Sequence, residues 1–301
     1  MNKIVNLLKE INPFNSKDTN NKVLYLIKIL LTTFIIYFIS LIIGEVLIIG
    51  GSYPFGFNAT DHQMSQDVVL LCSFYGYIIT ILLFLLFTKK IINKKISSIG
   101  LDKNFKTVFK GILIGIITLT IIIGIFLLCG AIKYNGFNRN NNIFVLILYF
   151  FGYFIQSSME ELISRGYLLH RLKEKLSIKN AVFISILFFV GGHLSKLFDE
   201  GLILGLCGVI NLFLISLIFT VLTLKDKNIY SAIGFHFIWN FILFNIIGLN
   251  LSGIEITNPL LKMEVVNSFL TGSSYGIESS IITTIVVFFI FIILKRKVVI
   301  K

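Results

Sequence analysis

Eight apolar runs recur along this 301-residue chain, and they restrict its fold more than any other feature. Runs of about 18 or more apolar residues cross the hydrocarbon core of a membrane, which is about 30 Å thick. A segment in lipid must satisfy its own backbone hydrogen bonds, and these runs are too long for barrel strands. We therefore expect an all-α polytopic membrane protein with about eight transmembrane helices. The runs are Val23–Ile49, Val68–Phe87, Val108–Ile132, Ile143–Ile163, Ala181–His193, Leu202–Leu224, Tyr230–Leu249 and Ser279–Leu294.

The fifth run is the weakest as a span, because it is short and contains Gly191-Gly192. Composition otherwise fits the membrane class: 56% of the residues are hydrophobic and 14% are charged, whereas soluble domains are about 25% charged. No repeat or linker divides the chain. We expect one membrane domain over residues 1–301, in which residues 1–22 form a cytoplasmic N-terminal segment.

The basic residues are distributed unevenly between the loops. The formal net charge is +12, and with the N-terminus inside, 22 of the 27 lysines and arginines fall in inner segments and 4 in outer ones. The positive-inside rule therefore places both termini in the cytoplasm. The basic inner face is expected to contact anionic membrane lipids and not nucleic acid.

The stretch Ser158–Arg165 brings two adjacent carboxylates and an arginine to the end of an apolar run. A charge near the bilayer centre costs about 2.5 to more than 10 kcal/mol, so such residues usually face water or protein and have a function. On a helix Glu161 and Arg165 lie one turn apart and can pair, whereas Glu160 is turned by about 100°. The second carboxylate can then face a cavity and act as a general base. A solvated ion pair at the cytoplasmic end of the helix is the alternative interpretation of this motif alone.

Two later runs each contribute a histidine, and His236 shares a helix face with Asn240 by i, i+4 spacing. At about 1.5 Å of rise per residue, His193 and His236 lie about 21 and 13 Å from the inner ends of their helices. Glu160 reaches a similar depth, about 16 Å, if the fourth helix continues to Arg171. We therefore expect helices 4, 5 and 7 to enclose a polar catalytic cavity that opens toward the cytoplasm.

The walls of this cavity are expected to include three small residues, Ser157, Gly191 and Gly192, which allow a substrate backbone to approach closely. Spans 2 and 3 contain no ionisable side chain within their apolar stretches and are expected to serve as scaffold.

Three motifs occur in order: Glu-Glu-x-x-x-Arg at residues 160–165, Phe-x-x-x-His at 189–193 and His-x-x-x-Asn at 236–240. Together they resemble the CPBP family of intramembrane proteases. That family includes the type II CAAX prenyl endopeptidases and bacterial, Abi-type members tied to bacteriocin processing or self-immunity. The resemblance covers residues 143–250, the expected catalytic core. It implies an endopeptidase that hydrolyses a peptide bond of a membrane-associated or lipidated peptide or protein, in a bacterial cell membrane.

The resemblance also implies a role for each motif residue. Glu160 would activate a water molecule and His193 would help to hold it, while His236 and Asn240 would face the developing oxyanion. Glu161 would be an orienting residue paired with the arginine of its own motif. Motifs of other protease classes, such as the HExxH sequence of zincins and the GxSxG elbow, do not occur in the chain.

The part played by a metal stays open at this point. A catalytic zinc needs about three protein ligands and one open position, and Glu160, His193 and His236 supply such a set, in keeping with the label metalloprotease that the family often carries. A glutamate base with histidine and asparagine needs no metal, and we slightly favour metal-independent chemistry.

A non-proteolytic function is the alternative. The same polar cavity would suit an immunity or scaffold protein that binds a membrane partner. The intact motifs weigh against this, because a pure binder need not keep a base, two histidines and an amide together. A solute transporter is less favoured still, because the spans lack broken polar helices or a charged relay.

Overall fold

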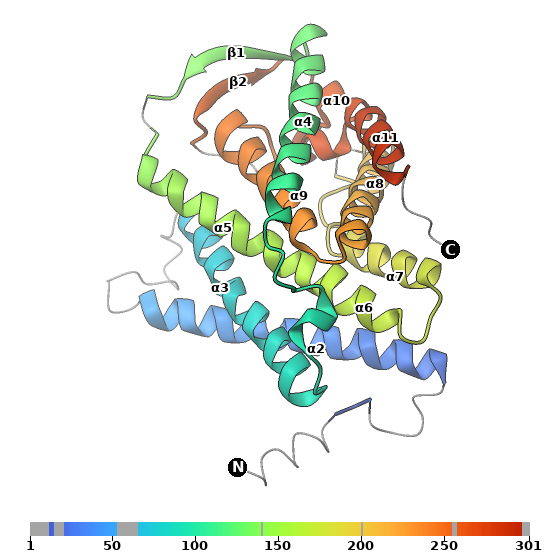
Figure 1. The fold of residues 1–301 in the computed structure, drawn as a ribbon. Helices are drawn as coiled ribbons and strands as arrows, with labels where there is room; N and C mark the ends of the chain where they lie inside the picture. Colours follow the sequence, from blue (N-terminus) through green and yellow to red (C-terminus); the bar gives the residue numbers. More distant parts are fainter. Residues whose placement is uncertain are drawn as a thin grey trace.

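The computed structural model describes residues 12–14, 21–52, 66–139, 141–199, 201–254 and 258–296. Its longer helices are α2 (Lys22–Ser52), α3 (Gln66–Leu86), α4 (Thr107–Leu128), α5 (Ile143–Glu161), α7 (Ile178–Gly191), α8 (Leu202–Asp226), α9 (Tyr230–Phe241) and α11 (Ile281–Lys295) (Figure 1). The short helical elements are η3 (Phe87–Ile91), η4 (Ile96–Ile99), η5 (Leu162–Leu168), α6 (Leu169–Leu172), η6 (Ile242–Ile247), α10 (Ser268–Thr271), η7 (Ser273–Tyr275) and η8 (Ile277–Ser279).

The predicted helical membrane class is confirmed. Six helical segments within the described ranges are long and apolar enough to cross a membrane: Lys22–Gly44, Asp67–Ile91, Thr107–Leu128, Ile143–Leu172, Leu202–Asp226 and Tyr230–Ile247. The remaining two, α7 and α11, have 14 and 15 residues, fewer than the roughly 17–25 that a span needs. The total of eight spans therefore stays a prediction. Most of the expected N-terminal segment 1–22 lies outside the described residues.

The fourth helix continues past Arg171, the length that the predicted depth of Glu160 requires. It begins at Asn142, whose side-chain oxygen accepts a hydrogen bond of 2.9 Å from the Phe144 amide and caps the first turn. α5 then continues without a break through the π-helical η5 and through α6 to Leu172. A π-helical turn widens the backbone locally and often occurs at functional sites. Here it begins directly after Glu161.

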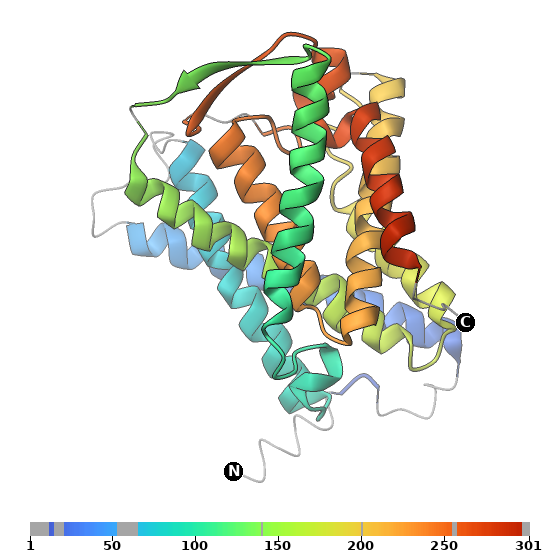
Figure 2. The same cartoon turned by 45° about the horizontal axis from the view of Figure 1, so that its top comes forward.

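α4 and α9 lie side by side, as Figures 1 and 2 show, and their backbones approach closely at two glycines. A Cβ atom on Gly111 would lie 1.9 Å from the Ser231 carbonyl oxygen, and one on Gly234 would lie 2.1 Å from the Val108 carbonyl oxygen. Gly111 and Gly115 form a GxxxG pair, the spacing that lets membrane helices approach closely. This contact fixes the rotation of α9, the helix that carries the third motif.

A small antiparallel sheet lies at one end of the molecule, an addition to the expected all-helical fold (Figures 1 and 2). β1 (Ile132–Phe137) follows α4, and β2 (Leu261–Val265) precedes α10, with Ile132 opposite Val265. Hydropathy did not indicate it, because both strands are short and mostly exposed. The sheet connects two loops that charge distribution assigns to the outer side.

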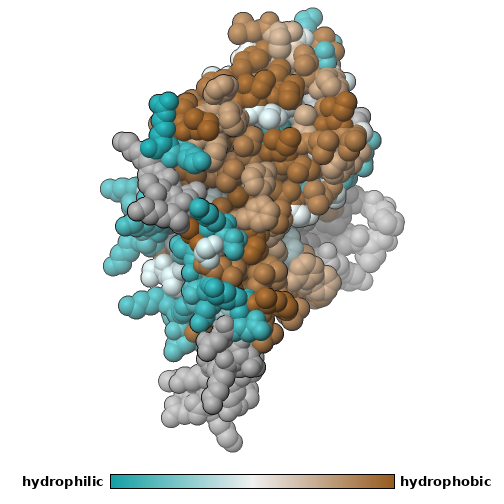
Figure 3. Space-filling model, turned by 90° about the vertical axis from the view of Figure 1, so that its right-hand side faces the viewer, coloured by the Kyte–Doolittle hydropathy of each residue, from teal (hydrophilic) through white to brown (hydrophobic). Residues whose placement is uncertain are grey.

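The outer surface of the helices is largely apolar. Figure 3 shows mostly hydrophobic side chains over the face where α8 and α11 lie, with hydrophilic ones gathered along one edge. On α2 the large side chains Phe34 and Phe38 are 62% and 57% exposed. Extensive exposed apolar surface marks contact with a membrane. Together with the apolar helices, this surface supports an integral membrane protein.

Candidate active site

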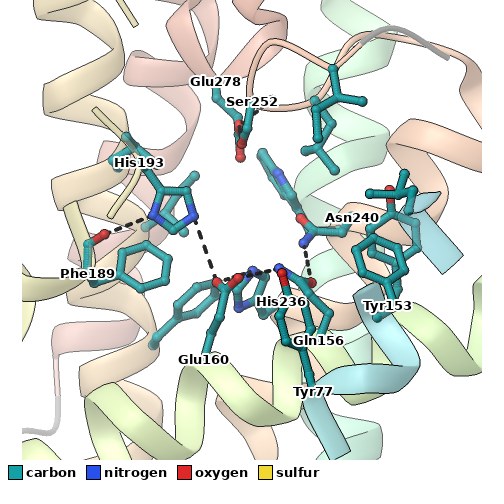
Figure 4. A pocket seen from close by; sticks show the side chains of 18 residues that line it. Tyr77, Tyr153, Gln156, Glu160, Phe189, His193, His236, Asn240, Ser252 and Glu278 are labelled. Atoms are coloured by element: carbon teal, nitrogen blue, oxygen red, sulfur yellow. Dashed lines mark hydrogen bonds and ion pairs between the residues drawn. The ribbon is translucent and has the colours of Figure 1, made fainter. Parts of the chain in front are cut away.

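The predicted motif residues meet around one carboxylate. Glu160, at the end of α5, places its Oε2 atom 3.8 Å from His193 Nε2 and 3.7 Å from His236 Nε2 (Figure 4). This oxygen is buried and has no hydrogen-bond partner among the described residues. The separation from His193 falls within the 3 to 6 Å, roughly, that a shared water molecule requires. Three segments far apart in the sequence thus present acid–base groups to one point.

The other oxygen of the same carboxylate is held by an amide. Gln156 Nε2 donates a hydrogen bond to Glu160 Oε1, and Gln156 Oε1 accepts one of 3.1 Å from Asn240 Nδ2. Gln156 precedes Glu160 by four residues, so both side chains lie on one face of α5. The amide links the first and third motifs. It leaves only Oε2 of Glu160 directed at the two imidazoles.

His193 lies in a turn directly after α7, and not within the expected span. Its Nδ1 atom is 2.8 Å from the Phe189 carbonyl oxygen. A carbonyl only accepts, so Nδ1 carries a proton, and when the ring is neutral its Nε2 atom is an acceptor facing Glu160. The Tyr275 hydroxyl donates to the backbone carbonyl of His193 at 3.0 Å. Burial, with the nearby Glu278 carboxylate, raises the pKa of the Tyr275 phenol, which keeps this donor protonated.

Glu161 and Arg165 form the expected pair, and both side chains are completely buried. Arg165 Nη1 lies 2.9 Å from Glu161 Oε1, and Nη2 donates to the hydroxyl of Ser216 on α8. His236 Nδ1 lies 3.0 Å from the same Glu161 oxygen, so the carboxylate also orients this imidazole. The guanidinium is 4.4 Å from the ring centroid of Phe189, a cation–π contact. Glu161 is therefore a buried structural partner, whereas Glu160 faces a cavity.

Two cavities meet at Glu160. An inner pocket of about 210 Å³ contains Glu160, His193, His236 and Asn240 in its walls and extends to Glu278. We call it the polar pocket. The second cavity, of about 630 Å³, lies between α2, the α5–η5 segment and α7 and is mostly apolar; we call it the lateral cleft. Four residues border both cavities: Tyr77, Glu160, Phe189 and His193.

The direction of the polar pocket differs from the expected cytoplasmic opening. Its far wall consists of Leu251, Ser252, Ile254 and Glu278, which belong to segments expected on the outer side. On the other side of Glu160, η5 and α6 are filled with side chains that have no exposed surface, namely Arg165, Tyr167, Leu168, Leu169 and Leu172. The polar pocket therefore does not extend along these buried side chains, whereas the lateral cleft borders Ile163 and Ser164 of η5.

The small residues expected in the cavity walls divide into two groups. Gly191 and Gly192 border the lateral cleft, and a Cβ atom on Gly191 would meet no atom within 4 Å. Ser157 borders neither the polar pocket nor the lateral cleft. It is buried, and its hydroxyl donates to Gln156 Oε1 at 3.3 Å. The prediction for Ser157 was wrong because the turn of α5 points it away from both spaces.

A metal site finds no support in the described residues. None of them form a group of three or more histidine, cysteine, aspartate or glutamate side chains placed to hold a metal ion. This includes the set considered for zinc, Glu160, His193 and His236. The label metalloprotease is therefore not supported.

Several residues of the site were not predicted. Gln156 could have been found from its i, i+4 spacing to Glu160, since an amide inside an apolar run also needs a partner. Ser216 and Tyr275 carry no such signal, because serine and tyrosine are common in helices and loops. Glu278 and Ser252 lie at the ends of a loop, where polar residues are expected, so sequence alone did not connect them with the site.

Comparison with known proteins agrees with the motifs. Residues 140–242 match the family model described as type II CAAX prenyl endopeptidase Rce1-like. No curated protein and no solved structure matches the chain. The matched segment is about a third of the chain and contains all six predicted site residues. Over that third of its length the chain is similar to the Rce1-like type II CAAX prenyl endopeptidases, and the family resemblance predicted from the three motifs is confirmed.

Proposed function

We propose that this protein is an intramembrane endopeptidase that hydrolyses a peptide bond of a membrane-associated or lipidated peptide, with Glu160 as the general base. The family match supports a CAAX-type protease. The observation that carries the proposal is the Glu160 Oε2 atom, buried without a hydrogen-bond partner and 3.8 and 3.7 Å from two imidazole nitrogens. A water molecule hydrogen-bonded to both this oxygen and His193 Nε2 would lie within reach of the base.

The distances support a first proton transfer to Glu160. A water held by Glu160 Oε2 and His193 Nε2 donates one hydrogen to each when the imidazole is neutral, because both atoms are then acceptors. Glu160 takes one proton as the water oxygen attacks the carbonyl carbon, and the carbonyl becomes a tetrahedral oxyanion. The same carboxyl then gives its proton to the leaving amine. This exchange balances without any further acid.

Donors for the oxyanion come from α9. Asn240 Nδ2 has two hydrogens, and one is used by Gln156, so the second is free to face the substrate. His236 shares its Nδ1 proton with Glu161, so its Nε2 atom donates only when the ring is an imidazolium. Trp239 Nε1 is a third donor, buried, in the pocket wall and without a partner among the described residues. One positioned donor of this kind contributes about 10²–10³ in rate.

The lateral cleft provides a route for a substrate held in the membrane. Its mouth includes Phe34 and Leu187, which are 62% and 49% exposed on the apolar surface, and its inner end reaches Glu160. An apolar chain can move from lipid into this cleft without crossing water. The arrangement favours substrates with an apolar segment or a lipid anchor next to the scissile bond.

The test is a comparison of membrane proteomes from cells with the wild type and with Glu160→Gln. The substitution keeps the size of the side chain and an acceptor for Gln156, so the folded amount should stay normal. We expect an uncleaved membrane precursor to accumulate, and a rate at least about 10²-fold lower with the purified protein in vesicles. Unchanged processing in Glu160→Gln would contradict the proposal and favour the partner-binding alternative.

A further inference from the structure

The polar pocket contains a second carboxylate opposite the first. Glu278, in η8, is 6% exposed, and Figure 4 shows its carboxylate facing the same space as Glu160 and His193. Its Oε2 atom accepts hydrogen bonds of 3.1 and 2.6 Å from the amide and hydroxyl of Ser252. Asn211 donates to the carbonyl oxygen of Glu278 at 2.9 Å and so fixes the backbone. The carboxylate is therefore held in place and not merely near the pocket.

No cation of the protein neutralises this group. Within the described residues Glu278 forms no ion pair, and the pocket walls contain no lysine or arginine. Arg165 is completely buried and occupied by Glu161. Lys196 donates to the Gly253 carbonyl at 3.2 Å and does not border the pocket. The only groups in the walls that can become positive are the imidazoles of His193 and His236, on the Glu160 side.

A buried carboxylate with two neutral donors is incompletely compensated. The amide and the hydroxyl of Ser252, both neutral donors, form the hydrogen bonds to Oε2. Burying an ionised group is costly unless an opposite charge and further hydrogen bonds accompany it. A cationic group of the substrate, placed in the pocket, would supply both. A second anion in the pocket would meet two carboxylates at short range.

We infer that Glu278 is a specificity residue that selects a lysine or arginine side chain on the pocket side of the scissile bond. This rests on the proposed function. The substrate enters by the lateral cleft, its scissile bond lies at Glu160 where the two cavities meet, and the residues beyond the bond occupy the polar pocket. The preferred substrates are therefore cut beside a basic residue.

The test uses the full-length protein in vesicles with N-palmitoylated dodecapeptides that have eight randomised positions and end either in a carboxamide or in a free carboxylate. Mass spectrometry of the products gives the residue frequencies on each side of the cleaved bond. We expect basic residues to exceed acidic ones at least about tenfold at one position, a ratio that corresponds to about 1.4 kcal/mol.

Two variants and a control make the result specific. Glu278→Gln keeps an acceptor for Ser252 and should reduce the basic preference severalfold, while Glu278→Lys should shift it toward acidic residues. Glu264→Gln changes an exposed carboxylate of β2 that hydrogen-bonds Asn135, and should leave the preference as in the wild type.

Three outcomes separate this inference from the proposed function. If no product depends on Glu160, the proposed function fails and the specificity assignment fails with it. If products depend on Glu160 but the wild type shows no basic preference, the assignment alone is overturned, whether or not the Glu278 variants fold. A basic preference that persists unchanged in folded Glu278→Gln also overturns it.

Discussion

The adjacent carboxylates Glu160 and Glu161 have different surroundings, and these surroundings distinguish their roles. Glu161 has no exposed surface and contacts both Arg165 and His236, whereas Glu160 is 20% exposed and borders two cavities. The α-helix produces this difference, because consecutive side chains point about 100° apart. Gln156 adds to it by holding one oxygen of Glu160. The two adjacent carboxylates thus contact opposite nitrogens of the same imidazole, that of His236, from different surroundings.

We expect Glu161→Ala and Arg165→Ala to reduce the amount of folded protein. Each leaves an unpaired charge in a region without solvent, a loss of about 3–5 kcal/mol. The measurement is the yield of monodisperse protein after detergent extraction, followed by its denaturation midpoint. Lys94→Ala is the matched control. It breaks an ion pair with Glu174 in which the lysine side chain is 39% exposed, and such pairs contribute about 1 kcal/mol or less.

A different result would change the assignment of Glu161. If either buried-pair variant accumulated at the wild-type level and were completely inactive, the orienting role would be wrong and a direct role in the reaction would replace it.

At the scale of elements, the contact between α4 and α9 sets the position of the third motif. Gly111→Ala should lower the free energy of unfolding by about 1–3 kcal/mol, because the new methyl group overlaps the Ser231 carbonyl oxygen. Turnover should also fall, since α9 carries His236 and Asn240. Thermal denaturation in detergent and the cleavage assay measure the two effects.

Gly124→Ala, in the same helix, is the control for this prediction. A Cβ atom there meets nothing within 4 Å, so the substitution should be neutral or stabilising by up to about 1 kcal/mol. Equal stability of both alanine variants would contradict the close contact of the helices.

At the scale of the whole molecule, the charge distribution predicts how the protein lies in the membrane. In a background with Cys72, Cys129 and Cys207 changed to serine, Lys262→Cys in β2 should react with a membrane-impermeant maleimide in intact cells. Lys95→Cys, in the lysine-rich loop after α3, should react only after lysis. Both positions are exposed, so access to the reagent reports the side of the membrane.

The reverse labelling pattern would overturn the orientation and would place the outer wall of the polar pocket, with Glu278, toward the cytoplasm. The assignment of Glu278 to the site does not depend on this, because it rests on the shared walls of the polar pocket.

Much of this protein could be predicted from the order of its residues. Long apolar runs identify membrane helices because the cost of polar backbone in lipid is a local property. The six motif residues could be found for a related reason. Charged and imidazole side chains are rare inside apolar runs, and a helix places i and i+4 residues on one face whatever surrounds it. These rules need no knowledge of neighbouring helices.

The remaining features depend on how helices rotate and which loops cover them. Ser157 was expected in a cavity wall and is buried beside Gln156. Consecutive side chains of a helix point about 100° apart, so a smaller rotation of α5 decides which side chain faces the cavity. The lateral cleft arises from a separation between α2 and α7 that no local pattern encodes. Glu278 is 118 residues from Glu160 in the sequence and lines the same pocket. A polar residue in a loop has no desolvation free energy to offset until the fold buries it, so its sequence position gives no signal. Several helix rotations and loop positions are nearly equal in local energy. The packing between segments distant in sequence therefore decided these features.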